Sequence, residues 1–153
     1  MQNSKNTKYS GVTEKFNMEV MTNYNNYIVE VALSYFKNVK KCIDFGAGIG
    51  TLAIILREKF NINPVCIEID EDNIDYLRKR KFKFVRNLKG APSENDLIFS
   101  SNVLEHIKDD QNTLNLMKKK LKRNGILFLF LPAKMLIWSD MDEAVGHYRR
   151  YEF

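Results

Sequence analysis

The chain has 153 residues, of which 44% are hydrophobic and 28% are charged, and its formal net charge at pH 7 is +5. This composition is typical of one globular domain and excludes global disorder. The first twenty residues are polar and lack the apolar stretch of a secretory signal. The most apolar stretch, 126–138, is interrupted by Pro132 and Lys134 and is too short to cross a bilayer. We therefore expect a cytoplasmic protein without a membrane span.

The positive charge is concentrated in two runs, 78–83 and 118–123. Both lie late in expected helices, where basic side chains complement the helix dipole. Aromatic residues are not interleaved with them, so the pattern does not favour a nucleic-acid partner. Cys42 and Cys66 each lie in a short apolar run, which indicates buried thiols and neither a disulfide framework nor a metal site.

Hydrophobic periodicity predicts alternating strands and helices after a polar arm over residues 1–21. The first expected elements are a helix over 22–36, a strand over 42–45, a glycine turn over 46–50, a helix over 51–60 and a strand over 65–69. A helix that Asp72 caps then extends to about residue 81, followed by a strand over 82–86, a loop over 87–95 and a strand over 97–99. The last two elements are a helix over 110–121, which Asp109 or Asp110 caps and Asn124-Gly125 ends, and a strand over 126–131.

Strands joined by crossover helices indicate an α/β fold with a doubly wound, Rossmann-like, mostly parallel sheet and flanking helices. The last strand is continuously apolar, as expected for a central strand that is buried on both faces. No linker divides the chain, so a single domain is expected over residues 22–153.

The sharpest motif is Asp44-Phe45-Gly46-Ala47-Gly48-Ile49-Gly50, in which an acid at a strand end precedes three alternating glycines and a helix. Glycines permit a tight turn and let a ligand approach the main chain beside the amides of a helix N-terminus. The spacing is G-x-G-x-G, whereas a dinucleotide fingerprint has G-x-G-x-x-G. A tight turn without any ligand is the alternative interpretation.

Glu68 lies at the end of the second expected strand, about one strand-helix unit after the turn. A carboxylate at this place can accept hydrogen bonds from both hydroxyls of a ribose. Asp70 and Asp72 are nearer to the start of the following helix and are better placed to cap it. The turn and Glu68 therefore point to one adenosine-containing ligand.

Four segments in chain order, 39–50, 67–70, 100–107 and 121–127, resemble the class I S-adenosylmethionine-dependent methyltransferases that act on small molecules. The resemblance implies S-adenosylmethionine as cofactor and S-adenosylhomocysteine as product. It implies transfer of the methyl group from the sulfonium to an O, N or C nucleophile of an unidentified, small-molecule acceptor. Members of this family usually have two more strands, so the chain is expected to be C-terminally truncated, of reduced activity, and able to self-associate through an exposed sheet edge.

By this resemblance, Asp44 holds the methionine end of the cofactor and the backbone of Gly46, Ala47, Gly48 and Gly50 lies along it. Ile69 packs on the adenine, Asn87 and Leu88 lie on the adenine side, and Ser101 and Asn102 border the methionine part. The family more often has Asp where Asn87 stands, but the side-chain oxygen of Asn87 can still accept from an adenine amino group.

The segment 138–151 resembles a substrate-side segment in one subgroup of these enzymes. His147 is the candidate catalytic base because imidazole titrates near neutral pH. Tyr148, Arg149 and Arg150 are candidate substrate residues, since guanidinium groups suit a carboxylate or phosphate. The alternative is that the charges of this segment pair with one another. His106 is expected to order the turn after the fourth strand.

Two other functions are compatible with the motifs. A nicotinamide-dependent oxidoreductase would share the glycine turn and Glu68, although the glycine spacing argues against it. A non-catalytic module that binds a cofactor or RNA is suggested by the basic charge balance.

Overall fold

The computed structural model describes residues 19–36 and 38–152, and the expected N-terminal arm lies outside them over residues 1–18. In the described residues, the elements are α2 (Thr22–Ser34), β1 (Cys42–Phe45), α3 (Thr51–Phe60), β2 (Val65–Ile67), α4 (Glu71–Lys79), β3 (Lys83–Val85), β4 (Asn95–Ser101), η1 (Leu104–His106), α5 (Asp110–Lys120), β5 (Leu121–Phe130), η2 (Met135–Ile137) and α6 (Asp140–Ala144). The expected alternation of strands and helices is confirmed.

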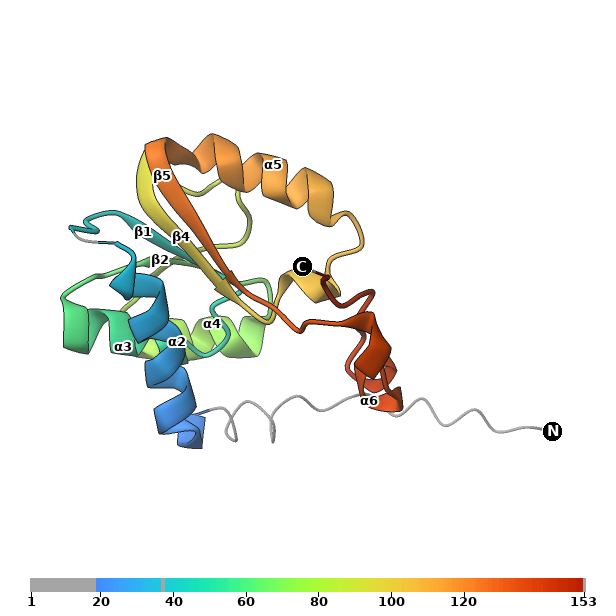
Figure 1. Cartoon of the computed structure of the whole chain (residues 1–153). Helices are drawn as coiled ribbons and strands as arrows, with labels where there is room; N and C mark the ends of the chain where they lie inside the picture. Colours follow the sequence, from blue (N-terminus) through green and yellow to red (C-terminus); the bar gives the residue numbers. More distant parts are fainter. Residues whose placement is uncertain (1–18, 37, 153) are drawn as a thin grey trace.

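The described strands form one parallel sheet in the order β3-β2-β1-β4-β5. The chain proceeds outward from β1 to β3 and then returns to β4 on the other side of β1. The carboxyl ends of β1 and β4 are therefore the topological switch point, where ligands bind in sheets of this kind. Helix α5 covers one face of the sheet, and α2, α3 and α4 cover the other (Figure 1). This arrangement confirms the doubly wound, Rossmann-like fold.

Alternate residues of the central strands pack into the two layers of the core, one on each face of the sheet. Ile43 and Ile98 are fully buried on the face that α5 covers. Phe99 is buried on the opposite face, where its ring stacks on Phe128 at 5.4 Å between centroids. Cys42 in β1 lies on that same face, and both cysteines of the chain are buried free thiols, as expected.

Two helices begin at aspartates whose carboxylates accept a backbone N–H. Asp70 accepts from Asn73 at 3.0 Å, so the cap of α4 is Asp70 and the expectation of Asp72 is wrong. Asp72 lies inside the first turn, where its charge faces the positive end of the helix dipole. For α5, Asp109 accepts from Asn112 at 3.1 Å, which selects it from the two expected caps.

The expectations for the last strand are wrong in two respects. Asn124-Gly125 does not end the preceding helix, because α5 ends at Lys120 and pairing with β4 begins at Leu121. Strand β5 also lies at the edge of the described sheet and not at its centre. Its side chains alternate between the face packed on α2 and the face packed on α5. A continuously apolar strand therefore indicates that both faces are covered, whether or not strands flank it on both sides.

Other boundaries differ by a few residues. Strand β4 is longer than the expected 97–99, because its polar ends, Asn95 and Ser101, also pair with β5. Strands β2 and β3 are each shorter than expected. Beyond β5, the chain leaves the sheet through η2 and α6 (Figure 1). Within the described residues, no helix combines the length and the apolar character needed to span a membrane.

Candidate functional site

The turn from β1 to α3 is built on left-handed backbone at three glycines. Gly46, Gly48 and Gly50 have φ of +76°, +56° and +85°. A Cβ atom at Gly46 would overlap the side chain of Val103, and one at Gly50 would lie 2.8 Å from Leu77. A Cβ atom at Gly48 would meet nothing within 4 Å. The outer glycines are thus required for packing, whereas Gly48 borders open space.

The carboxylate of Glu68 joins the end of β2 to this turn. It accepts three backbone N–H groups, from Gly48 at 2.7 Å, Ile69 at 2.7 Å and Asp70 at 2.9 Å. An ionised carboxylate has about four acceptor positions, so about one remains for a further donor in this arrangement. Glu68 is therefore both a structural link and an acceptor that lies beside the open space at Gly48.

Asp44 is a buried acid in the central strand β1. Only 2% of its surface is exposed, and its Oδ2 accepts no hydrogen bond from the described residues. Burial, and secondarily the charge of Glu68, raise the pKa of Asp44 to about 7. A buried acceptor without a partner is costly, so this oxygen is suited to a ligand that donates to it.

A cavity of about 710 Å³ opens at the carboxyl ends of the strands. The predicted site residues that line it are Gly46, Glu68, Ile69, Asn87, Leu88 and Asn102. The other predicted site residues are not among its lining residues, namely Asp44, Ala47, Gly48, Gly50, Ser101, His147, Tyr148, Arg149 and Arg150. The structure therefore brings the glycine turn, the acid and the adenine-side and methionine-side candidates to one place, the switch point of the sheet.

The sequence did not predict several walls of this cavity, namely Phe45, Ile67, Arg86, Lys89, Val103, His106, Ile107, Thr113 and Leu116. Most of them are apolar or lie far along the chain from the glycine motif, and an apolar side chain has no chemical signature of its own. The signal that could have found Val103 and Ile107 is topological, because they follow the strand that pairs with β1.

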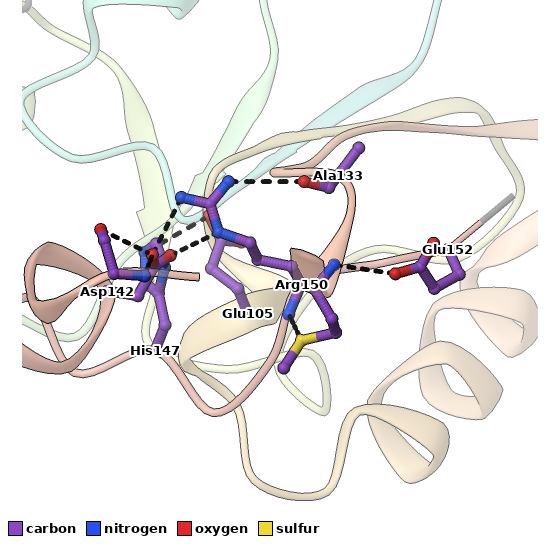
Figure 2. Close-up of polar contacts among 8 residues, drawn as sticks. Glu105, Ala133, Asp142, His147, Arg150 and Glu152 are labelled. Atoms are coloured by element: carbon purple, nitrogen blue, oxygen red, sulfur yellow. Dashed lines mark hydrogen bonds and ion pairs between the residues drawn. The ribbon is translucent and has the colours of Figure 1, made fainter. Parts of the chain in front are cut away.

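In the C-terminal segment, residues 138–151, polar groups converge on the buried Asp142 (Figure 2). Arg150 donates from Nε to Oδ1 at 2.8 Å and from Nη2 to Oδ2 at 2.9 Å, and Nδ1 of His147 lies 2.8 Å from Oδ1. The hydrogen bonds from Arg150 hold the pKa of Asp142 well below its usual range. In the tautomer that carries its proton on Nδ1, His147 donates to the ionised Asp142 and keeps a lone pair on Nε2.

The free Nε2 of His147 faces a second buried acid. It lies 3.9 Å from Oε1 of Glu105 in η1, a residue with no exposed surface. Neither carboxylate oxygen of Glu105 accepts a hydrogen bond from another described residue. The ring of His106 meets that of His147 edge-on, with centroids 4.6 Å apart. This ring contact ties the turn after β4 to the C-terminal segment.

Both candidate substrate arginines are bound within the chain. Arg149 donates to the carbonyls of Ile107 at 2.9 Å and Lys108 at 2.7 Å, and it pairs with Asp110 at 2.7 Å. Arg150 is the partner of the buried carboxylate described above. This internal pairing is the alternative that the sequence left open, and it fixes the C-terminal segment against η1 and the start of α5.

The strand order and the glycine turn define a Rossmann-like α/β domain. A family profile described as "Methyltransferase domain" matches residues 21–152. The chain therefore belongs to this methyltransferase-domain family, as its motifs predicted. A search of curated protein sequences finds no significant match.

Solved structures share the fold at low sequence identity. Phosphoethanolamine N-methyltransferase 2 of Haemonchus contortus, in complex with S-adenosyl-L-methionine, is 19% identical with a TM-score of 0.70, over 84% of this chain and 34% of that one. A putative S-adenosyl-L-methionine-dependent methyltransferase of Methanococcus maripaludis is 20% identical with a TM-score of 0.66, over 84% of this chain and 67% of that one. The chain thus spans about a third of the length of the Haemonchus enzyme.

The contrast between two glycines gives a stability prediction. Gly46→Ala and Gly48→Ala both place a side chain on left-handed backbone, which costs about 1–2 kcal/mol each. Only the Cβ atom at Gly46 also overlaps Val103, and overpacking adds about 1–3 kcal/mol. Urea denaturation should therefore show the larger loss of unfolding free energy for Gly46→Ala. Equal losses would contradict the assignment of Gly48 to open space.

The raised pKa of Asp44 predicts a pH dependence of folding. An unfolded Asp has a pKa of about 3.9, so the folded state binds this proton more tightly and loses that advantage as pH rises from about 4 to about 7. Asp44→Asn cannot titrate. Relative to this variant, the wild-type unfolding free energy should fall across that window in urea titrations. Parallel pH profiles for the two proteins would refute the shifted pKa.

Proposed function

We propose that the chain binds S-adenosylmethionine in the cavity at the switch point. In the proposed reaction, a methyl group passes from the sulfonium to an O, N or C nucleophile of a small-molecule acceptor. The observation that carries the proposal is the position of Glu68 at the carboxyl ends of the strands. Glu68 lines the cavity of about 710 Å³ and accepts from Gly48, where the turn borders open space. Membership of the methyltransferase-domain family supports it, as do related folds crystallised with S-adenosylmethionine or S-adenosylhomocysteine.

The residues at this edge fit the cofactor. The cavity volume lies within the range of about 300–1,000 Å³ usual for small-molecule sites. The unpartnered Oδ2 of Asp44 would receive a donor from the methionine end. Ile69 is 78% exposed, so it offers an apolar surface to the adenine. Asn87 would accept from the adenine amino group beside Leu88, and Ser101 and Asn102 would border the methionine part.

Ribose binding at Glu68 requires one contact to change. Three of its roughly four acceptor positions are used by backbone N–H groups, and the bond from Gly48 crosses from the turn. Two ribose hydroxyls need two positions. We therefore propose that the Gly48 N–H releases Glu68 when the cofactor enters, while the bonds from Ile69 and Asp70 keep the carboxylate in place.

When bound, the sulfonium supplies a methyl group that is already activated, so the chain has mainly to position the reactants. Holding two reactants in line can supply about 7–11 kcal/mol of a barrier. The mostly apolar walls formed by Phe45, Val103, Ile107 and Leu116 exclude water from the reaction. The backbone of Gly46, Ala47, Gly48 and Gly50 would lie along the cofactor beside these walls.

We place the acceptor side at the C-terminal segment. His147 is the proposed base for an acceptor that loses a proton, because Asp142 orients its ring and leaves Nε2 free to accept. Tyr148 is 55% exposed and available for contact. Arg149 and Arg150 act by holding the segment in place, since their donors are engaged within the chain.

Two buried free cysteines agree with a reducing compartment, so we propose that the reaction takes place in the cytoplasm. A small-molecule acceptor is proposed over a nucleic acid, and self-association would use the outer edge of β5. A second structure of the Haemonchus contortus phosphoethanolamine N-methyltransferase 2 contains phosphomonomethylethanolamine. Small phosphorylated amines are therefore the first acceptors to test.

Cofactor binding is tested by thermal denaturation with S-adenosylhomocysteine. At one hundred times its dissociation constant, a ligand stabilises the fold by about 2.7 kcal/mol. Glu68→Gln should weaken binding by at least about tenfold, or 1.4 kcal/mol. The control is Glu58→Gln, which alters an exposed acid of α3 and should bind normally. Stabilisation by NAD and not by S-adenosylhomocysteine would instead favour the oxidoreductase.

The role of His147 is tested by the separation of turnover from binding. A labelled methyl donor is incubated with small-molecule pools, and products are identified by their mass gain of one methyl group. His147→Ala should reduce turnover by about 10²–10⁴-fold, with little change in affinity for S-adenosylhomocysteine. Glu143→Gln, an exposed change in α6, is the matched control. Unchanged turnover in His147→Ala would remove this residue as the base.

A further inference from the structure

Three side chains beside the cavity have the composition of a metal site. Glu105, His106 and His147 each offer one ligand atom, and these atoms lie within 4.8 Å of one another. The first two come from η1 and the third follows α6, so the fold brings together groups about forty positions apart. We propose that these three residues bind one divalent transition-metal ion, for which Zn²⁺ is the leading occupant.

The acid of this group is buried without a hydrogen-bond partner. Glu105 has no exposed surface, and neither of its side-chain oxygens accepts a hydrogen bond from another described residue. A buried polar group that lacks a partner costs about 1–3 kcal/mol, and more when it is charged. A bound cation would satisfy both oxygens and favour the ionised acid.

A carboxylate holds the imidazole of His147 in one orientation. Histidines that bind metals usually give their other ring N–H to a carboxylate or a backbone carbonyl, which fixes the tautomer and the ring. His147 has such a partner in Asp142, which Arg150 holds in turn. The ring of His147 therefore has the supporting contact expected of a metal ligand.

Nε2 of His147 and Oε1 of Glu105 are separated by nearly the distance between two ligands of one ion. At 3.9 Å the two atoms are too far apart for a hydrogen bond. Two ligands of a tetrahedral Zn²⁺ ion, each bonded at about 2.0–2.2 Å, are about 3.4 Å apart. A small movement of the side chains is enough for both atoms to bind one ion.

The donor set selects the class of metal. Two imidazoles and one carboxylate suit Zn²⁺ and other transition ions, whereas Ca²⁺ and Mg²⁺ prefer oxygen ligands alone. Three protein ligands leave a position for water or for an oxygen of another molecule. His106 also lines the proposed cofactor cavity and His147 belongs to the C-terminal segment, so the ion would lie between the cofactor and the proposed acceptor side. With the ion bound, His147 is a ligand, and the ion takes over its proposed part in activating an acceptor.

The first experiment needs no variant. His106 and His147 are the only two histidines in the chain, so the imidazole region of a ¹H–¹⁵N NMR spectrum contains two side chains. Zn²⁺ alone is added to the full chain after treatment with a chelator. We expect saturation at one ion per chain with shifts in both imidazoles. Saturating Zn²⁺ that leaves either imidazole unshifted would overturn the site.

The second experiment measures Zn²⁺ affinity by calorimetry, with circular dichroism to confirm that each protein is folded. Asp142→Asn removes a supporting partner and should weaken binding by about 10–100-fold. Glu105→Gln and His147→Asn remove ligands and should weaken binding by more than this. Glu143→Gln is the control and should bind as the wild type does. Equal affinity in the folded ligand variants would place the ion elsewhere and refute the proposal. Because no methyl donor is present, the result is independent of the proposed methyl transfer.

Discussion

The left-handed turn between β1 and α3 is the constraint on which the rest of the site depends. Because Gly46 lies against Val103 and Gly50 against Leu77, the turn fits closely between the residues that follow β4 and helix α4. That fit brings the amide of Gly48 to Glu68 and leaves open space beside the Cα atom of Gly48. The parallel sheet supplies the crevice, and residues without side chains let the backbone form one of its walls.

The sequence predicted the fold best where the local signals are strongest. The bounds of β1 and α3 agree with expectation to the residue, because an apolar strand, alternating glycines and an amphipathic helix follow one another without a gap. The sequence did not predict that β5 lies at the edge of the described sheet. Its apolar pattern shows that both faces of the strand are covered, but it does not show how many strands pair with it. The walls Val103, Ile107 and Leu116 were missed because apolar residues do not identify their partners.

The C-terminal segment shows the same limit for polar residues. The sequence grouped His147 with Arg149 and Arg150. In the structure, His147 lies against η1 and Arg149 against the start of α5, whereas Arg150 binds Asp142. The structure also shows that Asp142 is the centre of the group and that Glu105 lies opposite His147, as Figure 2 illustrates. Periodicity cannot predict such pairings, since they depend on how a segment returns across the end of the sheet.

The two buried cysteines have a consequence for how opening of the sheet can be observed. Cys42 and Cys66 lie in adjacent central strands, and burial, followed by the charge of Asp44, raises the pKa of both thiols far above the ordinary range. Alkylating reagents react with the thiolate, so neither sulfur is attacked while β1 and β2 remain paired and covered. The rate of thiol labelling therefore reports how often the centre of this domain opens, without any introduced probe.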